Sequence, residues 1–199
     1  MDWLSLSDVE ARVNALESLM VEKGLAEHEA VDAVVASFEN DMGPTNGAKV
    51  VARAWTEPAY REWLLSDATA AIADMGFTGL QTEHMIAVEN TADKHNVVVC
   101  TLCSCYPWTL LGIPPAWFKY PQYRARVVKE PRSVLAEFGV ALPDEVAIDV
   151  WDSSAEIRYL VIPQRPTGTE GLTAEELVPL ISRDSMVGTA LASVPGVSA

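Results

Sequence analysis

The residues best suited to chemistry are three cysteines, Cys100, Cys103 and Cys105, which lie within the six-residue run CTLCSC. An odd number of cysteines excludes complete pairing within the chain. Cys103 and Cys105 are also too close in sequence to form an unstrained disulfide. Thiolates at this density bind soft or borderline transition metals. The spacing therefore predicts a metal site rather than a disulfide framework.

The Cys-Ser-Cys spacing favours one ligand set in particular. Thiolates at Cys103 and Cys105, together with the deprotonated backbone nitrogens of Ser104 and Cys105, fit around one metal ion as a planar set of chelate rings. Cys100 then reaches the metal from one side as an axial thiolate, and the opposite position stays open. An open position is typical of a catalytic metal rather than a structural one.

Two simpler interpretations compete with this one. His95 could serve as a fourth ligand and complete a Cys3His zinc site, which would make the chain a zinc-stabilised interaction module. Free cysteines also pack in protein cores as small apolar residues, but three within six residues disfavour that explanation. Elemental analysis separates zinc with unoxidised cysteines from a catalytic metal.

Residues 97–108 (VVVCTLCSCYPW) resemble the metal-binding segment of the nitrile hydratase alpha subunit. The resemblance extends over roughly residues 7–190, and its cysteine motif is highly specific. Further blocks read like the same subunit in the same order, and they are Gly47–Val51, Ala54–Thr56, Gly79–Gln81, Val88–Thr91, Gln122–Arg124, Val150–Ser154 and Pro163–Pro166.

The resemblance implies hydration of a small-molecule nitrile to its amide at a low-spin trivalent metal. Thr101 follows the first cysteine, which in this family implies cobalt(III), with iron(III) as the alternative. The family also implies that Cys103 is oxidised to sulfinic acid and Cys105 to sulfenic acid. The Cys105 sulfenate then acts either as the nucleophile or as the base for a water molecule. A related metal subunit, that of thiocyanate hydrolase, is the competing enzymatic interpretation.

The resemblance assigns roles to two further residues. Arg158 matches an arginine that supports the site, and Gln81 matches a glutamine near the active-site cavity, so the candidate catalytic residues are Cys105, Cys103, Arg158 and Gln81. From sequence alone, Arg158 could equally be a strand-end arginine in a surface ion pair, and Gln81 a loop glutamine. The expected partners are a beta subunit that contributes arginines and an activator protein that loads the metal. The expected assembly is a heterodimer or heterotetramer with the active site at the interface.

Composition is consistent with a globular enzyme subunit. The chain has 199 residues and a formal net charge of −14, with 49% hydrophobic and 21% charged residues. The acidic balance disfavours nucleic-acid binding, and no apolar run reaches the length of a membrane helix. Unpaired thiols and an N-terminus without the basic start of a signal peptide predict a cytoplasmic location.

The first part of the chain, residues 1–80, is predicted to be a helical arm that packs on the partner subunit. A capping box at Ser7 begins a helix that stops at Gly24, and apolar residues at helical spacing mark a second helix over 31–38. Thr56 is predicted to cap a further helix that carries Tyr60, Trp63 and Leu64 inward. Short helices then continue to residue 75.

The second part, residues 81–199, is predicted to be the metal-binding catalytic domain. Short apolar segments at 85–88, 97–99, 146–151 and 157–162 predict strands, and 130–138 predicts a helix. Prolines predict an irregular stretch after residue 106, and Thr173 begins a capping box for a last helix. The expected class is α+β, a helical arm followed by a layered α-β-β-α domain. The metal loop should lie at a strand end, where catalytic groups are commonly placed.

Overall fold

The protein divides into two compact units, residues 1–41 and 42–199, in a computed structural model that describes residues 6–79 and 81–194. The predicted domain boundary at residue 80 stays a prediction. Residues 1–5, on which the expectation about a targeting segment rests, and Leu80 lie outside the described residues. Within those residues no helix is long and apolar enough to cross a membrane.

The first unit contains two helices, α1 (Leu6–Glu22) and α2 (His28–Asn40). Both were predicted, although Ser7 lies inside α1 and is not its N-cap. Apolar side chains of α1 recur at helical spacing and are exposed, and they are Val9, Val13, Leu16 and Met20. An apolar stripe open to water is the pattern of a helix that buries this face against another chain, so packing on a partner subunit stays a prediction.

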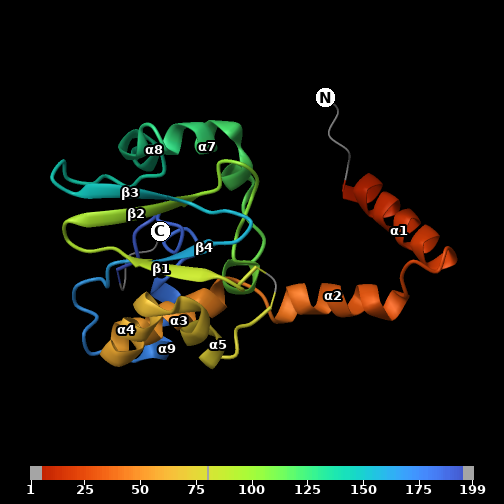
Figure 1. Ribbon diagram of the computed structural model, residues 1–199, viewed down its shortest axis with the longest axis horizontal. Coiled ribbons are helices and arrows are strands. Elements are labelled where there is room, and N and C mark those ends of the chain that lie inside the picture. The colour runs from red at the N-terminus through yellow and green to blue at the C-terminus, as the bar shows by residue number, and fades with distance from the viewer. Residues whose placement is uncertain (1–5, 80, 195–199) are drawn as a thin grey trace. The chain divides into compact units, whose positions relative to one another are not determined.

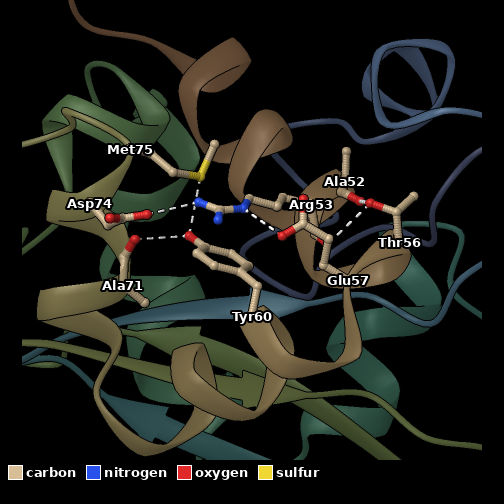
Figure 2. Close-up of polar contacts among 8 residues, drawn as sticks. All are labelled: Ala52, Arg53, Thr56, Glu57, Tyr60, Ala71, Asp74 and Met75. Carbon is tan, nitrogen blue, oxygen red and sulfur yellow. Dashed lines mark hydrogen bonds and ion pairs between the residues drawn. The ribbon is translucent and has the colours of Figure 1, made fainter.

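Three helices open the second unit: α3 (Pro44–Thr56), α4 (Pro58–Ser66) and α5 (Ala68–Asp74). Figure 2 shows how one arginine of α3 joins them. The Arg53 guanidinium lies 4.1 Å from the centre of the Tyr60 ring and donates to Glu57 and Asp74, each at 3.0 Å. The Tyr60 hydroxyl in turn lies 3.0 Å from the Ala71 carbonyl oxygen. Polar contacts therefore bind the three helices into one layer.

Two details of these helices differ from the sequence prediction. Thr56 does not cap α4, because it is the last residue of α3 and its hydroxyl donates to the Ala52 carbonyl at 3.0 Å. Glu57 occupies the N-cap position, and Pro58 follows in the first turn as expected. Tyr60 and Leu64 point inward, whereas Trp63 remains 39% exposed. The apolar face of α4 is thus narrower than predicted.

In the described part of the chain, four strands form two parallel pairs. β1 (Met85–Glu89) pairs with β4 (Arg158–Ile162), and β2 (Lys94–Val99) pairs with β3 (Ala147–Asp152). Figure 1 shows β2 and β3 next to α7 and α8, while β1 and β4 lie next to α3, α4, α5 and α9. The predicted α+β class and the α-β-β-α layering are therefore confirmed.

The C-terminal segment links the two strand pairs. The Val161 amide donates to the Met186 carbonyl at 2.9 Å, and the Val98 amide donates to the Val187 carbonyl at 2.8 Å. Gly188 follows with φ +90°, and a Cβ atom there would lie 1.9 Å from the carbonyl oxygen of Asn96. Only glycine fits this close approach between the segment and β2.

The stretch after residue 106 is more regular than its prolines predicted. It contains α6 (Trp108–Leu111), a 3-10 turn (Ala116–Lys119), α7 (Pro121–Val127) and α8 (Pro131–Glu137). Of these, α8 agrees with the helix predicted over 130–138, and the others were not predicted. Proline at the first helical position starts a helix rather than breaking one, and this applies to α7 and α8. Near the C-terminus, the predicted Thr173 capping box begins α9 (Ala174–Leu177), which a 3-10 turn (Val178–Leu180) extends.

Candidate metal centre

The cysteine loop begins directly where β2 ends. Val97, Val98 and Val99 are buried in the core and fix the strand, and Cys100 is the next residue. Cys100 is fully buried and Cys105 is 8% exposed, whereas Cys103 is exposed. A rigid strand therefore places the three cysteines at one edge of the sheet, as the sequence predicted.

The three sulfur atoms converge. The Cys103 sulfur lies 3.3 Å from that of Cys100 and 3.0 Å from that of Cys105, and all three lie within 4.8 Å of one another. All three cysteines are free. Soft donors gathered at one point without a disulfide fit a transition metal ion, so the donor set agrees with the predicted metal site.

The electrostatics of the loop favour an anionic Cys103. Hydrogen bonds from the Cys105 and Cys100 thiols lower the pKa of Cys103 to about 7, and the backbone N–H groups of Ser104 and Cys105 act in the same direction. Burial, followed by the neighbouring Cys103, raises the pKa of Cys105. The two amides that the sequence nominated as ligands therefore both stabilise the thiolate of Cys103.

Two contacts from distant parts of the chain hold the loop. The carboxylate of Asp152, the last residue of β3, accepts from the Thr101 amide at 2.9 Å and from its hydroxyl at 2.6 Å. On the other side, Nη1 of Arg124 in α7 donates to the Cys103 carbonyl oxygen at 3.0 Å. The loop is thus braced at its first and middle residues by groups that sequence proximity alone does not reveal.

Arg158 and Gln81 form a pair of their own. Arg158 begins β4 and is 6% exposed. Its guanidinium donates to the Ala155 carbonyl at 2.8 Å and to the side-chain oxygen of Gln81, which has a left-handed backbone with φ 69°. Within residues 6–79 and 81–194, neither side chain has a hydrogen bond to a cysteine. Their proposed roles at the site stay predictions.

His95 does not join the cysteines, so the Cys3His zinc site is wrong. It lies at the start of β2, about 16 Å from Cys100 at the usual rise of a strand. Its Nε2 bonds to the Gly188 carbonyl at 2.7 Å, and its Nδ1 lies 3.2 Å from the side-chain nitrogen of Asn90. Burial lowers the pKa of His95. Both ring nitrogens have partners in the protein, which makes this histidine structural.

A few buried polar atoms of the described residues have no hydrogen-bond partner. In the part of the chain that the structure describes, the buried side-chain nitrogen and oxygen atoms without a hydrogen-bond partner belong to Tyr106, Arg124, Ser153 and Arg158. Tyr106 follows Cys105, Arg124 contacts Cys103, and Ser153 follows the Asp152 that holds Thr101. Such orphans are uncommon in native structures and call for an explanation.

One cavity borders the cysteine loop. It has a volume of about 400 Å³ and lies between Thr101 and α7, where Arg124 and Lys129 provide positive charge. Another cavity, of about 420 Å³, lies between α3 and α9 and contains no cysteine. The first opens onto the braced loop, whereas the second is bounded by the ion pairs shown in Figure 2.

Sequence reasoning missed Arg124 and Asp152 as supports of the site. Arg124 is 21 positions from Cys103, and Asp152 is 51 positions from Thr101. Each belongs to a block that carried the family resemblance, and this was the signal that could have identified them. Neither has a spacing to the cysteines that a local pattern would reveal.

Comparison with known proteins agrees with this geometry. The family described as nitrile hydratase, alpha chain, matches residues 7–190. The chain is 56% identical over 190 residues to the high-molecular weight cobalt-containing nitrile hydratase subunit alpha of Rhodococcus rhodochrous, covering 95% of this chain and 94% of the relative. It is 53% identical over 182 residues to the cobalt-containing subunit alpha of Pseudonocardia thermophila, covering 91% and 89%.

More distant relatives share the fold. A solved double mutant of the Fe-type nitrile hydratase from Comamonas testosteroni Ni1 superposes with a TM-score of 0.89 at 40% identity, covering 98% of this chain and 96% of that one. Thiocyanate hydrolase subunit gamma of Thiobacillus thioparus is 38% identical over 205 residues, covering 97% of this chain and 83% of the relative. The family match over residues 7–190 and the identities above 50% show that the chain belongs to the nitrile hydratase alpha-chain family.

Proposed function

We propose that this chain is the metal-bearing alpha subunit of a nitrile hydratase, which adds water to a nitrile and releases the amide. The observation that carries the proposal is the convergence of three free cysteine sulfurs within 4.8 Å at the end of β2. The higher identity to nitrile hydratase alpha subunits than to the thiocyanate hydrolase subunit favours the nitrile as substrate.

The cofactor we propose is cobalt(III). The relatives at 53% and 56% identity are named as cobalt-containing, and Thr101 follows the first cysteine as in cobalt-type sequences. The sulfurs of Cys100, Cys103 and Cys105 and the backbone nitrogens of Ser104 and Cys105 would hold the ion. When bound, a trivalent metal with one exchangeable position supplies Lewis acidity to the nitrile or to the attacking water.

The protein residues supply the remaining chemistry. We propose that Cys103 is oxidised to sulfinic acid and Cys105 to sulfenic acid, two successive rungs of the thiol oxidation ladder. The Cys105 sulfenate oxygen then attacks the nitrile carbon or removes a proton from water. Arg158, with Gln81 bonded to its guanidinium, supports the site from the start of β4. Oxidised sulfurs are buried anions and require charged donors.

The partners we propose are a beta subunit and an activator protein that loads the metal, with the enzyme in the cytoplasm. The exposed apolar stripe of α1 supports an obligate partner. An alpha-beta heterodimer, alone or doubled to a heterotetramer, would bury on the order of 2,000 Å² or more.

The decisive experiment compares substrates and assemblies per bound metal. The chain is produced alone and together with its beta subunit and activator, and the rates of acrylonitrile hydration and thiocyanate hydrolysis are measured per cobalt. We expect acrylamide without acrylic acid from the complex and no turnover by the isolated chain. Faster thiocyanate hydrolysis would establish the competing activity instead. Equal rates from the isolated chain would exclude a shared site.

A further inference from the structure

Arg124 acts on a peptide group rather than on a side chain. Its Nη1 donates to the carbonyl oxygen of Cys103 at 3.0 Å. That oxygen belongs to the peptide group whose nitrogen is the Ser104 nitrogen, one of the backbone ligands proposed above. Peptide resonance shares charge between the nitrogen and the oxygen of one group. A cation at the oxygen therefore acts directly on the donor atom at the nitrogen.

We propose that Arg124 is a positioning and charge-balancing residue for the metal centre, an inference that rests on the proposed function. It fixes the plane of the Cys103–Ser104 peptide. It also stabilises the negative charge that the carbonyl oxygen carries when the Ser104 nitrogen exchanges its proton for the metal and that proton passes to solvent. Hydrogen bonds between an ionised donor and such an oxygen are roughly twice as strong as neutral ones.

The charge of Arg124 is available for this role. Other arginines pair with carboxylates, as Arg53 does with Asp74 and Arg61 with Glu89. No carboxylate pairs with Arg124 among the residues that the structure describes, and its buried Nε has no hydrogen-bond partner there. Three thiolates and two deprotonated amides carry five negative charges against a trivalent ion, so an excess of two remains. A guanidinium without a counterion is suited to offset part of it.

The helix that carries Arg124 is anchored to the strand that carries the cysteines. Tyr123 is buried, and its hydroxyl donates to the Val98 carbonyl of β2 at 2.7 Å. Val127, one turn further along α7, is fully buried. The guanidinium is therefore held at a fixed position relative to the loop, which is the requirement for a group that orients a ligand.

The proposal predicts what happens when the cation is removed. Without a donor at the Cys103 oxygen, more negative charge stays on the Ser104 nitrogen, and a proton competes better with the metal for it. In chains that do bind metal, the extra electron density at the ion raises the energy of charge transfer from sulfur. Both effects are separable from turnover, because one is read in metal content and the other in absorption.

The test uses the complete alpha-beta complex with Arg124→Gln, Arg124→Lys and the matched control Lys129→Gln, which removes a neighbouring charge from the same cavity rim. Cobalt per alpha chain is measured against cobalt supply, and absorption is normalised to bound cobalt. For Arg124→Gln we expect half-loading to require on the order of 10-fold more cobalt and the sulfur-to-cobalt band to move to shorter wavelength. In Arg124→Lys, cobalt loading and the band position should both return most of the way to the parental values. In Lys129→Gln, both should equal those of the parent.

Chemical rescue separates charge from structure. In Arg124→Ala the adjoining cavity of about 400 Å³ leaves room for a free guanidinium ion. Low millimolar guanidinium should return the band of this variant toward its parental position, which a purely structural defect would not allow. If Arg124→Gln bound cobalt as readily as the parent and its absorption band did not shift, the inference would be overturned. The proposed function would be unaffected, provided that the parent complex contains cobalt and hydrates nitriles. A parent complex without cobalt would instead refute the proposed function.

Discussion

The two ends of β2 differ in how their polar groups are hydrogen-bonded. At the start of the strand, His95, Asn90 and Asn96 bond to one another, to Trp151 and to the Gly188 carbonyl. At its end, the cysteine sulfurs lie within hydrogen-bond distance of one another and of the Cys103 amide. Among the described residues, buried atoms of Tyr106, Arg124 and Ser153 have no hydrogen-bond partner. The polar groups at the first end have partners within the chain, whereas the free sulfurs at the second are suited to bind a metal ion.

The network at the start of β2 fixes the state of its histidine. The side-chain oxygen of Asn90 accepts from the Asn96 amide at 2.7 Å, so the Asn90 nitrogen must donate to Nδ1 of His95. The ring is then neutral, with its proton on Nε2 directed at Gly188. A fully satisfied buried network of this kind stabilises one arrangement of the core, and it leaves no group free for catalysis.

The largest expected effect is the loss of cobalt binding and nitrile hydration when the cysteine loop at the end of β2 is changed. Cys105→Ala removes one thiolate from the proposed chelate, and we expect neither bound cobalt nor nitrile hydration above background in the complex. Metal analysis and an acrylonitrile assay measure both. His95→Gln provides the comparison, since folded chains of that variant should keep a full complement of cobalt. Retained cobalt in Cys105→Ala would contradict the ligand set.

The second-largest expected effect is a loss of stability, without a change in chemistry, at the start of β2. Gly188→Ala would place a Cβ atom 1.9 Å from the Asn96 carbonyl oxygen, and we expect it to lower the free energy of unfolding by more than about 3 kcal/mol. Gly139→Ala is the matched control, since Gly139 also has a positive φ of +84° but has no atom near the added Cβ. Gly139→Ala should lower the free energy of unfolding by about 1 kcal/mol. Equal decreases in the two variants would show that backbone strain, and not the close contact with Asn96, causes the effect.

His95 gives a smaller, pH-dependent effect. Burial lowers its pKa, so the unfolded chain binds a proton more readily than the folded one. The stability from neutral His95 is present above the unfolded value of about 6.5 and is lost as pH falls through the lowered folded pKa. His95→Gln should cost about 2 kcal/mol at neutral pH and remove this loss below pH 6.5. Thermal unfolding of parent and variant between pH 7.5 and 5 measures both.

The smallest expected effect concerns an orphan group near the cysteines. The Ser153 hydroxyl is buried and has no hydrogen-bond partner in residues 6–79 and 81–194, so Ser153→Ala should change the free energy of unfolding by less than about 0.5 kcal/mol. Thr109 is also buried but does interact with a partner, so Thr109→Val should lower the free energy of unfolding by more. Denaturant unfolding of both variants decides, and a large loss in Ser153→Ala would show that its hydroxyl is satisfied after all.

Local patterns in the sequence were enough to predict the elements and the metal loop. Apolar β-branched runs identified all four strands, and the cysteine spacing identified the ligands that converge at the end of β2. The capping box at Thr173 was also confirmed. These features depend on neighbours within a few residues, which one sequence displays directly.

Features set by distant neighbours were not predictable in the same way. His95 has cysteines nearby in sequence, yet the extended strand carries them apart and the C-terminal segment provides its partner at Gly188. Arg124 and Asp152 reach the loop only because α7 and β3 pack beside β2. The helix predicted over 130–138 is present as α8, whereas α7 was missed inside a stretch that its neighbouring prolines marked as irregular. Proline is compatible with the first turn of a helix, and Pro121 begins α7.

Cobalt K-edge X-ray absorption of the purified alpha-beta complex tests the central claim most directly. The account predicts three sulfur and two nitrogen scatterers around each cobalt ion, from Cys100, Cys103, Cys105 and the two backbone amides, and one sulfur fewer in any metal left in Cys100→Ala. A centre with three sulfurs and no nitrogen, or zinc in place of cobalt, would contradict it.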